Sequence, residues 1–263
     1  MRFQTVLLLL MLPVAAALAG GAGLAAKGGY VSLPGGHFRT ALRYEDRRNG
    51  VRIAPFALMQ RPVTNAEFLG FVRAHPQWRR DRVASVLAGP AYLAQWDGAE
   101  ALGAHALAQQ PVTQVSWFAA QAYCQAQDAR LPNWNEWEYA AAADETRRDA
   151  RKDPLWRERI LGWYSRPSNG PLPRAGLQAP NAYGVQDLHG LVWEWTDDFS
   201  SLLVDGDNRN QGDSDTSKFC GAGALSMDDR ENYAVLMRVA MLSSLQAADT
   251  TANLGFRCAK DLR

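Results

Sequence analysis

The segment 217–232, S-K-F-C-G-A-G-A-L-S-M-D-D-R-E-N, combines a lone thiol with a run of polar side chains. The thiol is that of Cys220, and a thiolate can act as a nucleophile or as a soft metal ligand. The small neighbours 221–224 also suit a packed, unreactive cysteine. Three roles therefore stay open for Cys220: an inert buried residue, a functional thiol or metal ligand, and half of an intermolecular disulfide. The polar residues that would form a ligand pocket or an ordinary solvated loop are Ser226, Asp228, Asp229, Arg230 and Asn232.

A second candidate for chemistry is the triplet Trp193-Glu194-Trp195, in which a carboxylate lies between two indoles. In a strand, the two tryptophans would point to one face and Glu194 to the other. Glu194 would then be an acid–base group or a substrate anchor, with Trp193 as an aromatic wall. The alternative, which we favour, is a structural carboxylate in the core. Arg257, and by analogy Arg238, are predicted to hold buried carboxylates of this kind.

The N-terminal segment predicts export. One early cation, Arg2, precedes an apolar run, and the triplet 17–19 (Ala-Leu-Ala) fits a signal-peptidase site. We therefore expect a Sec-type signal peptide at residues 1–19, with cleavage between 19 and 20 or between 25 and 26. The mature protein would be periplasmic or secreted and free of the membrane. An uncleaved anchor is the alternative, and Pro13 within the run argues against it.

The composition excludes some classes of partner. The 263-residue chain carries a net charge of +1 and has a pI near 7.7, so a nucleic acid or an anionic membrane is not expected as the main partner. The length after the signal suits one domain, residues 28–263. Nine tryptophans are many for this length and can build a core in a loop-rich fold.

Several short elements must position these residues. Residues 30–40 read as a strand, a Pro-Gly-Gly turn and a second strand, and 51–59 as a further strand. Thr64 or Asn65 caps a predicted helix, and Ser116 caps another over about 117–127. Asn133 and Glu136 form a capping box for a helix that extends to residue 143.

Polar residues dominate the rest of the chain. The segment 145–180 is rich in Arg, Pro and Gly, so it is predicted to be mostly loop and to form the rim of a site. Residues 181–199 read as a turn and a strand, and 205–218 as a loop.

Six motifs, taken in order, resemble the formylglycine-generating enzyme family, also called sulfatase-modifying factors. They are L-P-G-G-H-F (33–38), P-V-T-N-A-E-F (62–68), P-V-T-Q-V-S-W-F-A-A-Q-A-Y-C (111–124), R-L-P-N-W-N-E-W-E-Y-A-A (130–141), N-A-Y-G-V-Q-D-L-H-G-L-V-W-E-W (181–195) and N-L-G-F-R-C-A (253–259). The resemblance implies an α+β, C-type-lectin-like single domain with little regular secondary structure. It also implies a disulfide between Cys124 and Cys258, which leaves Cys220 as the odd cysteine.

The sequence departs from the family pattern at the cysteines that carry out formylglycine synthesis. Catalytic members carry two nearby cysteines that bind copper, on the segment after an R-G-G-S-W motif. Here F-C-G-A-G-A-L (219–225) stands at that motif and M-D-D-R-E-N-Y (227–233) follows without a cysteine. A dithiolate copper site needs two soft ligands, so formylglycine synthesis is not expected, and copper would have only the lone thiol.

Two other metals of the family lack their usual ligands. Leu191 replaces the asparagine that supplies a calcium ligand in some members, so calcium would depend on backbone carbonyls. The four histidines do not make the H-x-x-x-H-x-E pattern that holds iron in another branch.

Two functions follow from the resemblance. The first is a non-catalytic accessory, maturation or binding factor for an exported protein or peptide, similar to the nitrite-reductase accessory proteins that serve periplasmic copper enzymes. The second is an oxidative enzyme that acts on a peptide or a secreted small metabolite. It would use Glu194, Cys220 and the cluster 228–230.

Overall fold

The structure is a computed structural model that describes residues 29–42, 50–165, 170–202 and 233–262. The predicted signal peptide and the candidate residues of segment 217–232 lie outside the described residues. The candidates concerned are Cys220, Ser226, Asp228, Asp229, Arg230 and Asn232.

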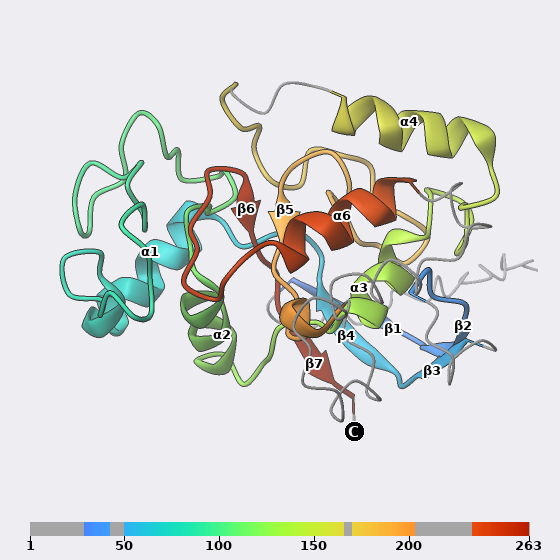
Figure 1. The fold of residues 1–263 in the computed structure, drawn as a ribbon, viewed down its shortest axis with the longest axis horizontal. Helices are drawn as coiled ribbons and strands as arrows, with labels where there is room; N and C mark the ends of the chain where they lie inside the picture. The colour runs from blue at the N-terminus through green and yellow to red at the C-terminus, as the bar shows by residue number, and fades with distance from the viewer. Residues whose placement is uncertain (1–28, 43–49, 166–169, 203–232, 263) are drawn as a thin grey trace, which may run out of the picture.

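Short strands form three small sheets (Figure 1). In the three-stranded sheet, β4 (Phe56–Met59) lies between β1 (Tyr30–Leu33) and β7 (Ala259–Asp261), and both pairings are antiparallel. The first and last described parts of the chain thus meet on one central strand.

The other two sheets have two strands each. Strand β2 (Gly36–Phe38) pairs antiparallel with β3 (Val51–Ile53), and β5 (Trp193–Glu194) pairs parallel with β6 (Leu254–Gly255).

The two strands expected within residues 30–40 are present, but they join different sheets. Gly35 separates them with a φ of 63°, and a side chain there would meet the Ile53 carbonyl oxygen at 2.3 Å. The single strand expected over 51–59 is also divided, into β3 and β4. Pro55 lies at the break, where its missing N–H prevents a continuous ladder.

Three helices begin at the caps that the sequence predicts. Thr64 caps α1 (Asn65–Ala74) and Ser116 caps α2 (Trp117–Gln125). Asn133 caps α3 (Trp134–Ala141), where it and Glu136 bond each other's backbone N–H groups. Each cap satisfies N–H groups that an unaided helix end would leave without partners.

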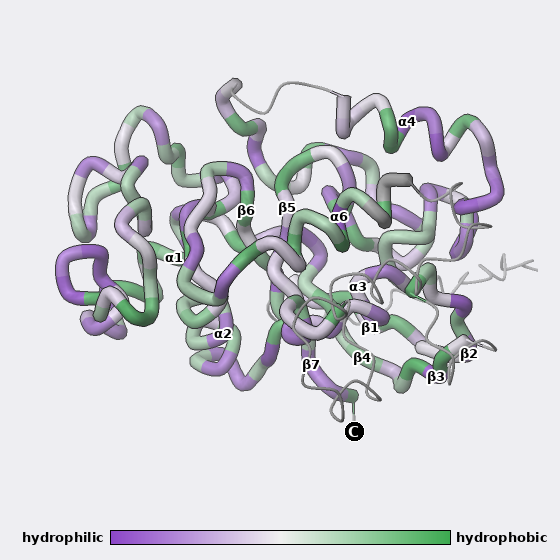
Figure 2. Tube along the Cα trace, in the orientation of Figure 1, coloured by the Kyte–Doolittle hydropathy of each residue, from purple (hydrophilic) through white to green (hydrophobic). Residues whose placement is uncertain are grey.

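Two further helices were not expected. Helix α4 (Pro154–Tyr164) occupies part of the segment predicted as loop, and α6 (Tyr233–Ser243) follows the undescribed segment. Asp153 caps α4 by accepting from the N–H groups of Leu155 and Trp156. Hydrophilic and hydrophobic residues alternate along α4 (Figure 2), and it lies at the edge of the molecule, beside α6.

Two single-turn helices, η2 (Pro76–Trp78) and η3 (Phe199–Ser201), complete the described elements. The fold is therefore α+β and contains much irregular backbone. No helix in the described residues is long and apolar enough to cross a membrane.

Tryptophans and a disulfide consolidate the core. Trp96, Trp134, Trp137 and Trp195 are each at most 2% exposed. Cys124 of α2 is bonded to Cys258, with their Cα atoms 5.5 Å apart, which is the disulfide that the resemblance implies. The bond ties α2 to the chain just before β7.

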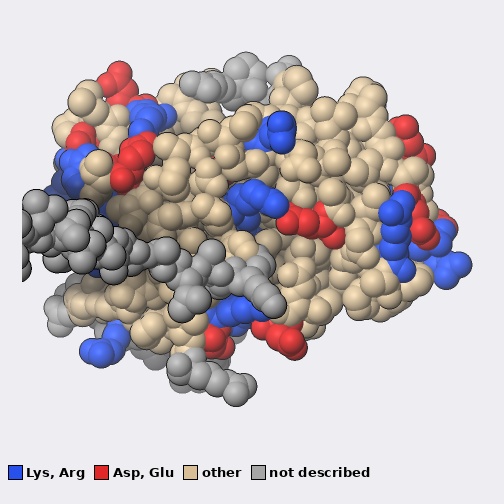
Figure 3. Space-filling model, turned by 180° about the vertical axis from the view of Figure 1, so that it is seen from behind, with Lys and Arg blue, Asp and Glu red and all other residues tan. Residues whose placement is uncertain are grey.

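Charged side chains form small mixed groups on the face opposite to that of Figure 1. Figure 3 shows basic and acidic residues next to one another, separated by uncharged surface. On this face the described residues present no broad basic surface of the kind that binds nucleic acid.

Candidate functional site

The Glu194 carboxylate is sealed in an ion pair with Arg257. The Arg257 guanidinium donates from Nε to Oε2 and from Nη2 to Oε1, both at 2.8 Å, and both side chains are 0% exposed. Trp137 Nε1 donates a third bond to Oε2 at 2.9 Å. A carboxylate engaged in this way has neither solvent access nor a free oxygen for substrate.

Arg257 also joins the backbones of separate segments. It donates to the carbonyl oxygens of Met59 and Gln60 through Nη1 and of Gln186 through Nη2, at 2.9–3.2 Å. The role of Arg257 in holding a buried carboxylate is therefore seen in the structure. The burial and the ion pair of Glu194 are those expected of a structural carboxylate in the core, the interpretation that the sequence favours.

Arg238 does not bond a carboxylate among the described residues, contrary to our expectation. Its guanidinium carbon lies 3.5 Å from the centre of the Trp137 ring, and Nη2 donates to the Glu194 backbone carbonyl at 2.5 Å. Arg238 Nε is buried and has no hydrogen-bond partner among the described residues. Burial lowers the pKa of Arg238 to about 10, although Glu194 acts to raise it. The indole face contributes a cation–π contact to the guanidinium.

Trp193 belongs to an aromatic group at the end of α4. Its ring centre lies 5.7 Å from that of Trp163 and 5.2 Å from that of Tyr164. Burial raises the pKa of Tyr164 to about 12. The end of α4 thus packs on Trp193.

No group of three or more potential metal-ligating side chains is found in the described residues. Leu191, at the position where some relatives carry a ligand asparagine, is 6% exposed. The candidate thiol of Cys220 lies outside the described residues.

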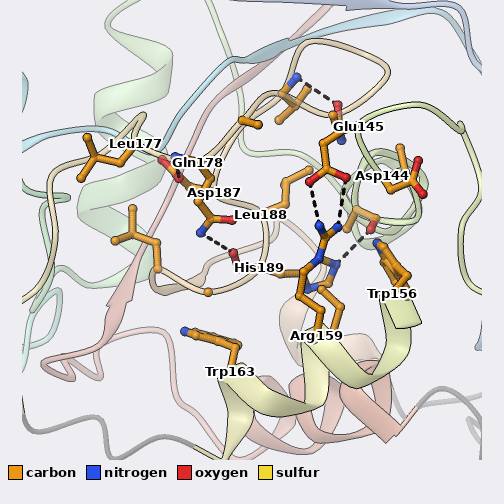
Figure 4. A pocket seen from close by; sticks show the side chains of 18 of the residues that line it. Asp144, Glu145, Trp156, Arg159, Trp163, Leu177, Gln178, Asp187, Leu188 and His189 are labelled. Carbon is orange, nitrogen blue, oxygen red and sulfur yellow. Dashed lines mark hydrogen bonds and ion pairs between the residues drawn. The ribbon is translucent and has the colours of Figure 1, made fainter. Parts of the chain in front are cut away.

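A cavity of about 390 Å³ lies between α4 and the loop region 173–191 (Figure 4). The segment 145–180, predicted as the rim of a site, forms much of its wall. Leu177 and Trp163 lie at one side, while Arg159, Glu145 and Trp156 lie at the other. Glu194 and Trp193 are not among the residues that line it. The volume is in the range of small-ligand pockets.

The three carboxylates that line this pocket already have partners. Asp144 accepts from the Arg147 guanidinium, and Arg159 pairs with Glu145 at 2.8 Å. Asp187 accepts from the backbone N–H groups of 176 and 178. Arg147 lowers the pKa of Asp144, whereas burial raises that of Asp187.

His189 lies beneath the pocket, between Trp137 and Trp156. The two indole rings meet the imidazole edge to face at 5.7 and 5.6 Å. The Nε2 atom lies 2.9 Å from the Ala141 carbonyl oxygen, which assigns the proton to Nε2. The Nδ1 atom is buried and meets no hydrogen-bond partner in the part of the chain that the structure describes. Burial lowers the pKa of His189 to about 4, so the ring is neutral near pH 7.

The described pocket is large enough for a small ligand. Its three carboxylates are each engaged by an arginine or by backbone N–H groups, and Nδ1 of His189 is shielded from solvent. The sequence did not single out this pocket, because its walls come from an unpredicted helix and a loop. The one indication of this pocket in the sequence is the polar, proline-rich composition of 145–180.

Comparison with known proteins identifies relatives of the chain. Residues 17–262 match the family described as "Sulfatase-modifying factor enzyme 1-like domain". A formylglycine-generating enzyme of Streptomyces coelicolor is 30% identical, with 89% of each chain covered. The inactive C-alpha-formylglycine-generating enzyme 2 of Bos taurus is 28% identical, with 87% of each covered. The solved structure of PvdO from Pseudomonas aeruginosa aligns at 19% identity with a TM-score of 0.46, covering 89% of this chain and 94% of the other.

Proposed function

Because the chain belongs to the sulfatase-modifying factor enzyme 1-like domain family, we propose that it is an accessory factor that binds an exported protein. It acts on the maturation of that partner, for which a periplasmic copper redox enzyme is the first candidate. It does not synthesise formylglycine.

The observation that carries this proposal is the state of the pocket beside α4. The cavity has the size of a ligand site, yet each acidic side chain that lines it is already engaged. General acid–base catalysis requires a titrating group within reach of the substrate. A preformed pocket whose carboxylates are all held in ion pairs or hydrogen bonds is suited to recognition.

Two other observations support a role without formylglycine synthesis. The segment 217–233 contains Cys220 alone, whereas a dithiolate copper site needs two cysteines. One of the relatives that matches over most of its length is named an inactive formylglycine-generating enzyme. A member of this family that lacks synthase activity therefore has a precedent.

The proposal is tested in the source organism by deleting the gene. We expect the exported copper redox enzyme to lose activity while its polypeptide is still made, and activity to return with the wild-type gene. The copper content of the enzyme, isolated from both strains, then shows whether metal loading is the affected step. Full activity and full copper content in the deletion strain would contradict the proposal for this class of partner.

The purified mature protein provides a second test. After incubation with copper, oxygen and a cysteine-containing peptide, and reduction of any disulfide, the peptide mass should equal that of a control without the protein, whereas formylglycine formation would convert the cysteine CH2–SH group into an aldehyde. Thiol titration and metal analysis complete the test. One reactive thiol with bound copper, together with oxidation of the peptide, would establish the oxidative alternative instead.

A further inference from the structure

We propose that the pocket between α4 and the 173–191 region binds a peptide segment of the partner in which an apolar side chain stands next to a carboxylate. This inference rests on the proposed function and names the chemistry that the same site recognises.

The apolar part of the occupant is indicated by the side of the pocket that holds Leu177 and Trp163. Leu177 is 66% exposed, so its apolar surface faces solvent at the pocket mouth. Gly190 lies between Trp163 and Gln178. A Cβ atom at this position would come within 3.0 Å of Gln178 Nε2 and 3.4 Å of the Trp163 ring. The glycine thus leaves the indole wall and the pocket floor open for an apolar side chain.

The carboxylate is indicated by the charges that line the pocket. Four of the five ionisable side chains that could carry charge there are engaged: Asp144, Glu145, Arg159 and Asp187. Arg174 is exposed and has no ion pair or hydrogen bond to another described residue. An arginine fork beside apolar surface suits a carboxylate, which it can bind through two parallel hydrogen bonds.

The pocket walls are preformed. Gln186 Nε2 donates to the carbonyl oxygens of Gly176 and Gln178, and Gln178 Nε2 donates to that of His189. Asp187 holds the same loop from the other side through the N–H groups of 176 and 178. A loop fixed by side-chain bonds loses little conformational entropy when a peptide binds. This arrangement favours an extended segment that lies along the loop.

The test uses the purified mature protein and two fluorescein-labelled hexapeptides, Gly-Ser-Leu-Asp-Ser-Gly and Gly-Ser-Leu-Lys-Ser-Gly, read by fluorescence polarisation. We expect the acidic peptide to bind about threefold to fivefold more tightly at low ionic strength, as an exposed charge pair should provide. The preference should shrink in 0.5 M salt. Equal binding of the two peptides would overturn the assignment.

Charge reversal makes the test specific. Arg174→Glu should invert the preference, so that the lysine peptide binds more tightly. Arg52→Glu is the matched control, because Arg52 is also exposed but lies on β3 and does not line the pocket. An unchanged preference in Arg174→Glu, or an equal inversion in Arg52→Glu, would contradict the proposed role of Arg174.

The apolar contact has its own pair of variants. Leu177→Ser should weaken both peptides, whereas Leu155→Ser should weaken neither, since Leu155 is 76% exposed on α4 and does not line the pocket. N-acetylleucine distinguishes a peptide from a small acid. If it competes as strongly as the peptide does, the occupant is a small carboxylic acid and the peptide assignment is wrong.

The two proposals fail separately. If gene deletion impairs the partner enzyme while the Arg174→Glu gene restores it fully, the accessory role stands and this pocket is not the contact. If deletion has no effect while the peptide preference is inverted by Arg174→Glu, the pocket assignment stands and the proposed partner is wrong.

Discussion

Arg257 and Glu194 form two parallel 2.8 Å hydrogen bonds at a place where neither side chain reaches solvent. The two residues come from segments 63 positions apart in the chain. Removing one partner of a buried pair leaves the other charge without compensation.

We expect Glu194→Gln to lower the free energy of unfolding by about 3–5 kcal/mol, the loss found when a buried ion pair is broken. Urea denaturation followed by circular dichroism measures it. Glu145→Gln is the control, because Glu145 and Arg159 are 45% and 55% exposed and such a pair contributes under about 1 kcal/mol. Equal losses in the two variants would show that Glu194 is not the structural anchor described above.

The two buried arginines should respond differently to replacement by methionine. Arg257→Met leaves the buried Glu194 carboxylate without its counter-ion and should lower the free energy of unfolding by about 3–5 kcal/mol. Arg238→Met removes a buried charge that lacks a carboxylate partner among the described residues and keeps an apolar contact with Trp137. Because the Glu194 carbonyl oxygen loses its hydrogen bond, we expect the free energy of unfolding to fall by about 1–2 kcal/mol, less than in Arg257→Met. A large loss in Arg238→Met, measured by the same urea titration, would contradict this assignment.

Reduction of the Cys124–Cys258 bond should destabilise the fold strongly. The bond joins residues 134 positions apart, and the chain-entropy model assigns a loop of that size about 5 kcal/mol. Urea midpoints with and without a reducing agent measure the effect. The double variant Cys124→Ala/Cys258→Ala should be insensitive to the reductant, whereas Cys220→Ser should respond as the wild type does. A reductant effect that survives in the double variant would implicate Cys220 instead.

His189 should make the fold sensitive to acid. Burial lowers its pKa to about 4 in the folded protein, and an unfolded histidine titrates near 6.5. The unfolded state therefore binds more protons between these values, so stability is full above about pH 6.5 and falls as the pH drops toward 4. The total loss from this one group is about 3 kcal/mol.

His189→Phe keeps a ring between Trp137 and Trp156 and lacks the titrating nitrogen. Its unfolding free energy should fall less steeply than that of the wild type between pH 6.5 and 4. Because other acidic groups contribute equally to both proteins, the difference between the two slopes is the relevant measurement. Parallel slopes would mean that His189 is not held neutral by burial.

Local patterns predicted the helices whose signals lie within a few residues. The caps at Thr64, Ser116 and Asn133 satisfy the first N–H groups of their own helices, so no distant contact is needed to recognise them. The pairing of β1 with β4 and of β2 with β3 joins separate segments. Such pairing depends on which surfaces pack together, and the local sequence of 30–38 does not contain that information.

The contacts of the candidate site also join distant segments, so the local sequence predicts them only in part. The W-E-W triplet located Glu194 correctly in a strand, but the sequence could not establish which arginine reaches its carboxylate. The sequence does not predict helix α4, because only two of its residues, Trp156 and Ile160, are fully buried and they do not make a long apolar stripe. The pocket depends on that helix, so its place follows from the packing and not from the local sequence.

Strand β7 and the residues just before it have a consequence for the order of events in biogenesis. Arg257 forms the ion pair with Glu194, and Cys258 is bonded to Cys124. The next residue begins β7, which pairs with β4 at the edge of the sheet. A chain that has emerged only as far as residue 256 therefore has all three places unfilled. Its core cannot close before Arg257 and Cys258 are available, so these two residues set the earliest point at which the described fold can form.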